Sequence, residues 1–494
     1  MKHNNKKILN ATKWSSVAEI SSRLIAPLTN IILARLLVPE AFGIIATITL
    51  IITFFDLFVE SGFHNYLIQN KFKSDADILK TANVAFWSNL FLSACFFILV
   101  VIFRFNITNL LNINGLENLL IVASTQLFIN AFISVPSALL KRNLDFKSIF
   151  LVKIASVFVP LIITIPLAFL GFSYWSVVIG NLGMSLCTSI LMNLRSSWSP
   201  SLSFDFNKLK EMYSFSFWTQ LESIVIWMTI WIDTFIISYY LNSYYLGIYK
   251  TSMSLVNNLM AIVASSILPV LFSSLSRLQN DEKEFNIVLL KFQKIVSLIV
   301  VPMGIGLYVF QDLATNILLG NQWKDASQII GLWGLSSAIV VSLGYFNSEV
   351  YRAKGRPKLS VVSQTIHLAI LVPSLVAVGN QSFESLLYVR VLVRVLGTAI
   401  GLGFLHYFFE IKIKSIFLNV APSFYTGAAM GLLGYLLILL NNNLFINLIF
   451  VVICSIFYLW LLSINISTKN EFEYVKKSFS FINVFRKKRY NDLN

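Results

Sequence analysis

The chain is poor in charge and in cysteine, and each shortage excludes a class of protein. Only 12% of its residues are charged, against roughly 25% in a soluble domain, while 56% are apolar. A soluble protein of 494 residues with so few charges could not cover its own surface, so lipid is the expected solvent. Cys95, Cys187 and Cys454 stand singly inside apolar runs, which indicates neither a disulfide framework nor a metal site.

Sequence motifs of catalysis are missing as well. The four histidines are scattered and form no HExxH pattern or other ligand cluster, so no metal site is predicted. No glycine-rich P-loop is present, and we expect no nucleotide or other cofactor. The longest predicted loop, residues 195–211, leaves no room for the external catalytic domain of a membrane polymerase or ligase. The chain is therefore predicted not to be an enzyme.

Positive charge is in excess, with a formal net charge of +15. A nucleic-acid-binding protein would gather this charge on one folded face together with aromatic side chains. Here the Lys and Arg residues form short clusters between long apolar runs, which is the pattern of the positive-inside rule. Nucleic acid is therefore not expected as a partner.

Apolar runs long enough to cross a membrane fill most of the chain and predict about fourteen transmembrane helices, at about 20 residues each. The predicted helices are 12–37, 41–64, 80–104, 117–140, 148–171, 174–194, 212–240, 244–272, 285–311, 325–350, 358–378, 383–408, 416–440 and 443–465. Glu19 and Arg23 interrupt the first run, so we interpret it as a retained span rather than a signal peptide.

Loop charge predicts the orientation of these helices. If the N-terminus is inside, the inner loops and the C-terminal tail hold nearly all the loop Lys and Arg residues, and the outer loops hold only Arg104 and Lys324. A bias of this size fixes topology. Both termini are therefore predicted to be cytoplasmic, and the number of spans is predicted to be even.

A weak internal repeat divides the first twelve helices. When Gly43 is aligned with Gly247, Thr47 meets Thr251. Two six-helix halves in the same orientation would pack as two lobes around a cavity, and rocking of the lobes gives alternating access. The predicted domains are an N-terminal lobe at 1–211, a C-terminal lobe at 212–411, and two appended helices with a basic cytoplasmic tail at 412–494.

Residues 33–69 (LARLLVPEAFGIIATITLIITFFDLFVESGFHNYLIQ) resemble the amino-terminal signature of bacterial polysaccharide flippases. These are exporters of the O-antigen and colanic-acid type in the multidrug/oligosaccharidyl-lipid/polysaccharide exporter superfamily. The match includes Ala34-Arg35, Pro39 and Phe42-Gly43, and the loop Tyr351–Leu359 (YRAKGRPKL) is also similar to the family. The resemblance implies a twelve-helix core of two lobes, often with two added helices, in a bacterial inner (plasma) membrane.

The resemblance also implies the function, which is to flip undecaprenyl-pyrophosphate-linked oligosaccharide units to the outer leaflet for surface polysaccharide synthesis. The expected partners are this substrate, membrane lipid, and a polysaccharide polymerase and glycosyltransferases. A cation-coupled multidrug exporter of the same superfamily is the alternative, and a membrane polymerase or ligase is a more distant one.

Basic residues inside the predicted spans are candidates for binding the pyrophosphate, because charged groups at this depth usually face a cavity and guanidinium binds phosphate oxygens in pairs. Arg23 lies about 16 Å into the first helix. Arg390 and Arg394 are four residues apart on the twelfth helix, where outward snorkelling of Arg390 and a hydrogen bond from Arg394 to helix carbonyls are the alternative. Arg35 and Lys250 lie closer to the predicted outer surface, where snorkelling to the headgroups is an alternative.

Arg23 follows Ser22, and similar lipid II flippases carry a Ser-Arg pair whose arginine faces the cavity, which implies the same place for Arg23. An ion pair with Glu19, four residues earlier, is an open alternative. Pro27, one turn past Arg23, is a candidate hinge, although a static kink explains it equally.

Acidic residues inside the predicted spans are candidates for ion coupling. Such carboxylates can bind Na⁺ or a proton, or they can pair with the basic residues named above, and both alternatives remain open. The candidates are Glu19, Asp56, Glu222 and Asp233.

Overall fold

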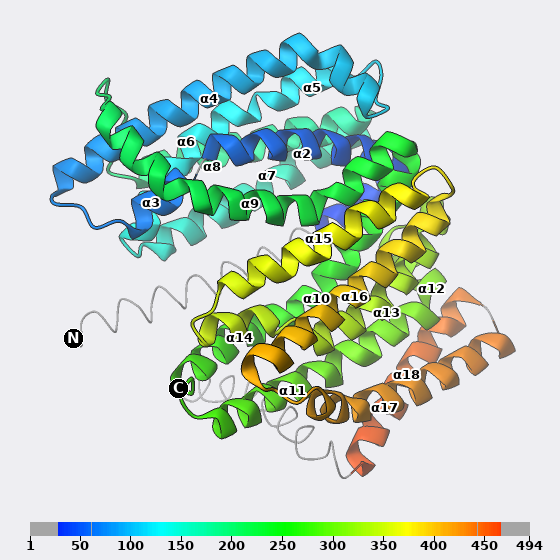
Figure 1. Cartoon of the computed structure of the whole chain (residues 1–494). Helices are drawn as coiled ribbons and strands as arrows, with labels where there is room; N and C mark the ends of the chain where they lie inside the picture. The colour runs from blue at the N-terminus through cyan, green and yellow to red at the C-terminus, as the bar shows by residue number, and fades with distance from the viewer. Residues whose placement is uncertain (1–27, 61, 442, 466–494) are drawn as a thin grey trace, which may run out of the picture. The chain divides into compact units, whose positions relative to one another are not determined.

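The computed structural model describes residues 28–60, 62–441 and 443–465, and for side chains it leaves out 60, 215–219, 264–266 and 269–270. These residues are almost entirely helical, and no strand occurs among them (Figure 1). The predicted all-α fold of a polytopic membrane protein is confirmed.

The chain divides into two compact units. The first unit contains the described part of Met1–Thr251 together with Leu375–Phe383. The second contains Ser252–Ser374 and the described part of Glu384–Asn494. The lobe boundaries that we expect from the repeat, after residues 211 and 411, stay a prediction.

The first unit is built from long helices and a few short ones that interrupt them. They are α2 (Pro39–Glu60), α3 (Phe63–Gln69), α4 (Asp75–Leu110), α5 (Glu117–Ser124), α6 (Gln126–Arg142), α7 (Phe146–Phe169), α8 (Ser173–Arg195) and α9 (Phe206–Tyr240). The start of α10 (Ser243–Arg277) also belongs to it. Polar caps fix several of these starts. The Ser74 side chain accepts a hydrogen bond from the backbone N–H of Asp77 at the start of α4, and Asp205 caps α9 in the same way.

The second unit begins within α10. Its other helices are α11 (Glu282–Val309), α12 (Gln311–Leu318), the 3₁₀ helix η1 (Asn321–Ala326), α13 (Ser327–Leu343), α14 (Asn347–Ala353), α15 (Lys358–Val378), α16 (Phe383–Phe409), α17 (Ile413–Leu440) and α18 (Leu444–Ile464). Hydroxyl groups join these helices where they pack. Ser297 of α11 lies 2.9 Å from Ser423 of α17 between their Oγ atoms, a type of contact that stabilises helix pairs in lipid.

Within the described residues, 12 helices are long and apolar enough to cross a membrane. They correspond to twelve of the predicted spans, so the chain is a multi-pass membrane protein. The predicted span at 244–272 lies within α10, and the first predicted span, 12–37, falls mostly outside the described residues. The total number of spans and the side of the termini stay predictions.

The predicted span at 41–64 is two helices in the structure. Gly62 adopts a φ of 72°, a left-handed conformation that glycine reaches without a steric penalty, and it separates α2 from α3. The backbone turns at this point, and α3 begins directly after it. This break places His64 on a short helix next to α6 instead of at the end of a continuous span.

The first turns of α2 and α10 cross at very close range. A methyl group on Gly43 would overlap the carbonyl oxygen of Ser243, and one on Gly247 would overlap the carbonyl oxygen of Pro39. Each glycine therefore makes room for the backbone of the other helix, as small residues do at close helix crossings in membranes. Thr47, one turn further along α2, lies 3.1 Å from the Ser238 hydroxyl of α9.

Candidate functional site

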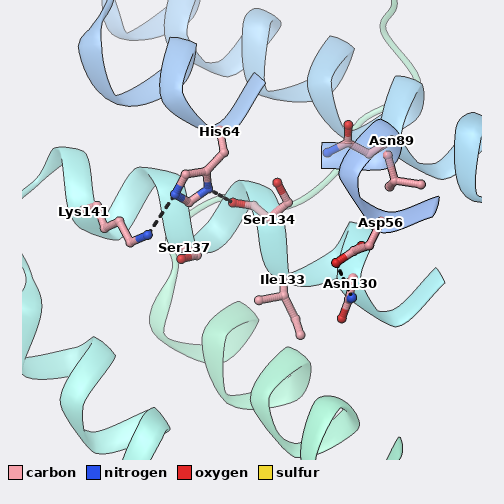
Figure 2. A pocket seen from close by; sticks show the side chains of 9 residues that line it. Asp56, His64, Asn89, Asn130, Ile133, Ser134, Ser137 and Lys141 are labelled. Carbon is pink, nitrogen blue, oxygen red and sulfur yellow. Dashed lines mark hydrogen bonds between the residues drawn. The ribbon is translucent and has the colours of Figure 1, made fainter. Parts of the chain in front are cut away.

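A polar cavity of about 260 Å³ lies in the first unit between α2, α3, α4 and α6 (Figure 2). Its lining consists of Asp56, Val59, His64, Asn89, Asn130, Ile133, Ser134, Ser137 and Lys141. All but two of these residues carry polar side chains, although they lie on or beside strongly apolar helices. Ionisable groups at such positions are costly and mark sites of binding or transport.

One side of the cavity carries a lysine–histidine pair. The Nδ1 atom of His64 lies 3.1 Å from the carbonyl oxygen of Ser134, and the Nζ atom of Lys141 lies 2.9 Å from Nε2 of His64. A carbonyl can only accept, so Nδ1 carries the imidazole proton and Nε2 accepts a hydrogen bond from the lysine. The geometry therefore supports a neutral His64 that holds a charged Lys141.

The other side of the cavity carries a carboxylate and two amides, as Figure 2 shows. Asn130 donates a hydrogen bond of 3.1 Å from Nδ2 to the Oδ2 atom of Asp56, which also fixes which way its amide points. Asn89 is fully buried, yet neither its Nδ2 nor its Oδ1 atom has a hydrogen-bond partner within the described residues. A buried polar group left in this state costs about 1–3 kcal/mol, so Asn89 calls for a ligand or water.

A second cavity, of about 220 Å³, shares Asp56 and His64 with the first and extends to α9. Its lining includes Gln220, which donates a hydrogen bond of 2.8 Å to the Leu57 carbonyl oxygen. The two cavities together give Asp56 polar space on two sides.

The second unit holds a different arrangement, in which two arginines lie against one buried tryptophan. The guanidinium carbon of Arg394 lies 3.9 Å from the centre of the Trp333 ring, and that of Arg390 lies 5.6 Å from it. These are cation–π distances. Arg390 and Arg394, which their spacing on α16 predicted as a pair, therefore lie together against Trp333 of α13.

Hydroxyl groups and an amide complete this arginine–tryptophan cluster. Arg394 donates from Nη1 to the Ser336 hydroxyl at 3.1 Å and to the Ser337 hydroxyl at 2.9 Å. The indole N–H of Trp333 donates to Oδ1 of Asn257 at 2.9 Å. The ring and the two hydroxyl groups orient the guanidinium group of Arg394, and the Asn257 amide orients the ring. Two guanidinium groups beside one indole ring are suited to binding an anion.

Asp233 and Lys250, predicted as separate candidates, form an ion pair in the first unit. The Lys250 Nζ atom lies 3.7 Å from Oδ1 of Asp233, whose side chain is 1% exposed. Tyr249 donates a 2.9 Å hydrogen bond to Oδ2 of the same carboxylate, and Lys250 also lies 4.5 Å from the Trp231 ring centre. A carboxylate bonded on both oxygens favours a structural role over ion coupling.

The structure does not gather the remaining candidates into these sites. Arg35 and Glu222 are exposed, on the helical segment at 28–36 and on α9. Arg23, Glu19 and Pro27 lie outside the described residues, so their roles stay predictions. Within the part of the chain that the structure describes, no three His, Cys, Asp or Glu residues come together as a metal site.

Apart from Asp56, the residues that line the polar cavity were not predicted from the sequence. His64 and Lys141 are far apart in the chain and meet only because α3 folds back toward α6. Asn89 carries a usable signal in the sequence, because it is an uncharged polar residue inside a long apolar run.

Comparison with known proteins agrees with this architecture. The model of a family described as "Polysaccharide biosynthesis protein" matches residues 32–328. The chain is 25% identical to an uncharacterized membrane protein of the cps region of Klebsiella pneumoniae over 75% of this chain and 76% of that protein. It is 24% identical to the succinoglycan biosynthesis transport protein ExoT of Rhizobium meliloti over 69% of each.

Among solved structures, the fold resembles that of the lipid II flippase MurJ in an inward closed conformation, with a TM-score of 0.70. The two chains are 16% identical, and the similarity covers 91% of this chain and 98% of MurJ. At this identity the likeness concerns the fold alone. The family match, by contrast, covers more than half of the chain, and the predicted resemblance to polysaccharide flippases is confirmed at that level. The chain belongs to the polysaccharide biosynthesis protein family.

Proposed function

We propose that the protein carries undecaprenyl-pyrophosphate-linked oligosaccharide units from the cytoplasmic to the outer leaflet of a bacterial plasma membrane by alternating access. The observation that carries this proposal is the arginine–tryptophan cluster, Arg390, Arg394 and Trp333, within membrane-spanning helices of a polysaccharide biosynthesis protein. A transport protein among its relatives agrees with the expectation that the chain is not an enzyme.

The chemistry of the cluster suits the head group of this substrate. A pyrophosphate brings negative charge into a low-dielectric region, where attraction to a cation is much stronger than in water. A guanidinium group stays charged there and binds phosphate oxygens through paired N–H groups. Because Trp333 and two serines hold Arg394 in place, little side-chain freedom is lost when the anion binds.

The other predicted cations take secondary places in this proposal. Arg23 and Arg35 would add positive charge along the path of the head group, while the polyprenyl tail stays in the bilayer. Lys250 is held by Asp233, so we assign the pair to the stability of α9 and α10. Glycosyltransferases that build the unit and a polymerase that uses it are the proposed functional partners.

Deletion of the gene tests the proposal. Lipid-linked repeat units should accumulate in the cytoplasmic leaflet, and surface polysaccharide should be lost, with both restored by the intact gene. The readout is the leaflet distribution of the lipid-linked sugar in membrane vesicles, probed with a glycosidase that cannot cross the bilayer.

Two outcomes would contradict the proposal. Normal polysaccharide together with new drug sensitivity would favour a cation-coupled multidrug exporter. Repeat units that reach the outer leaflet but stay unpolymerised would favour a polymerase.

A further inference from the structure

We infer that Asp56, Asn89 and Asn130, on one side of the polar cavity of the first unit, form a binding site for a monovalent metal cation of the sodium type. This inference goes beyond the proposed function, because it concerns a different unit and a ligand of opposite charge. It rests on the cavity, the burial of Asn89 and the types of atom present.

Asn89 is the observation that points to a ligand. Its side chain is 0% exposed and lines the cavity, but neither of its polar atoms is hydrogen-bonded within the described residues. Ser93 is also fully buried on the same helix, and its hydroxyl donates to the carbonyl oxygens of Asn89 and Leu127. The same helix therefore satisfies a neighbouring polar side chain and leaves Asn89 open toward the cavity.

The donor set selects the kind of ligand. Asp56 supplies carboxylate oxygens and Asn89 an amide oxygen, which are the hard ligands that alkali and alkaline-earth cations prefer over transition metals. Asn130 donates to Asp56 through Nδ2, so its Oδ1 atom points away from the carboxylate and its place in the site is to orient Asp56. One carboxylate offers a single negative charge, which favours a monovalent over a divalent cation.

The positive charge that lines the same cavity lies away from this donor set. In Figure 2, Lys141 and His64 occupy the side of the cavity opposite Asp56 and Asn130. The lysine is turned toward Nε2 of His64, at 2.9 Å. A cavity of about 260 Å³ holds a cation with several waters between the two sides, and those waters would complete its coordination.

The test is a sodium titration of thermal stability on the purified full-length protein in detergent. NaCl replaces choline chloride at constant ionic strength, and the unfolding midpoint is followed for the wild type, Asp56→Asn and Asn89→Leu. The matched control is Asn106→Ala, an exposed asparagine on the same helix as Asn89. The wild type and the control should gain stability with a saturable sodium dependence, and both cavity variants should lose this sodium-dependent gain.

Asn89→Leu separates binding from a structural role. It removes the open amide, so without sodium the variant should be at least as stable as the wild type, and it should gain nothing when sodium is added. A loss of stability that is equal with and without sodium would overturn the inference, as would an equal response of the wild type to NaCl and choline chloride. A sodium response that survives in Asp56→Asn would also overturn it.

Discussion

The polar groups of the two units are organised in opposite ways. In the first unit, a carboxylate, amides and a lysine–histidine pair surround open space, and Asn89 is unsatisfied within the described residues. In the second unit, Arg394 lies on an indole ring and donates to two hydroxyl groups, so protein atoms hold it directly. The first arrangement suits a small ligand that enters and completes the bonding. The second suits a fixed charge that acts on a larger anion.

The largest expected effect concerns the arginines of the second unit and tests whether their fixed charge acts on a larger anion. Arg390→Ala combined with Arg394→Ala should lower export of lipid-linked sugar about 100-fold or more, because two charge-assisted phosphate contacts contribute about 1.5–3 kcal/mol each. The measurement is surface polysaccharide per unit of membrane-inserted protein. Arg277→Ala, an exposed arginine at the end of α10, serves as the control and should export normally. Normal export by the double variant would show that the two arginines do not act on the substrate.

The next largest effect is on stability rather than on export, and it concerns the Asp233–Lys250 ion pair of the first unit. Asp233→Leu leaves Lys250 without its partner carboxylate and should lower the free energy of unfolding by about 3 kcal/mol, the lower end for a buried pair because Lys250 is 20% exposed. Adding Lys250→Met should recover most of the loss. Asp77→Asn removes the more exposed Lys208–Asp77 pair and should cost no more than about 1 kcal/mol. If recovery fails, the pair has a role beyond stability.

Trp333→Phe and Trp333→Leu test whether the ring of Trp333 positions the two arginines. It keeps an aromatic ring beneath the guanidinium groups but removes the N–H bond to Asn257, so stability should fall by about 1 kcal/mol while export stays within severalfold of normal. Trp333→Leu removes the ring as well and should reduce export further at equal expression. Equal export by the two variants would show that the ring does not position the arginines.

The smallest effect lies at the lysine–histidine pair. His64→Gln retains a side chain that can donate to the Ser134 carbonyl and accept from Lys141, so thermal stability should fall by no more than about 1 kcal/mol. His64→Leu removes both bonds and should cost more. A larger loss in the glutamine variant would mean that the imidazole itself is required, for example as a site of protonation.

The sequence predicted the helical membrane fold well because apolar length alone determines a span. It also singled out Arg390 and Arg394, because residues four apart on a helix share a face. It could not pair either of them with Trp333, which is distant in the chain and comes close only through the packing of α13 against α16.

The polar cavity was harder to foresee for two physical reasons. Its lining comes from four helices, so no local pattern connects Asp56 with Asn89 or His64 with Lys141. The break at Gly62 also turns α3 away from the line of α2, whereas hydropathy alone predicts a single span there. Buried amides carry no charge, so a search for charged residues inside spans passes over Asn89, although its unmet hydrogen bonds within the described residues mark the cavity.

The crossing of α2 and α10 has a consequence for the history of the chain. Under the alignment of Gly43 with Gly247, Pro39 corresponds to Ser243, so the contact of Gly43 with Ser243 is the counterpart of the contact of Gly247 with Pro39. Reciprocal contacts of this kind define the interface of a two-fold symmetric homodimer. The crossing therefore carries in its packing the same internal repeat that the alignment finds in the sequence, which is the relation that duplication of a half-length chain would produce.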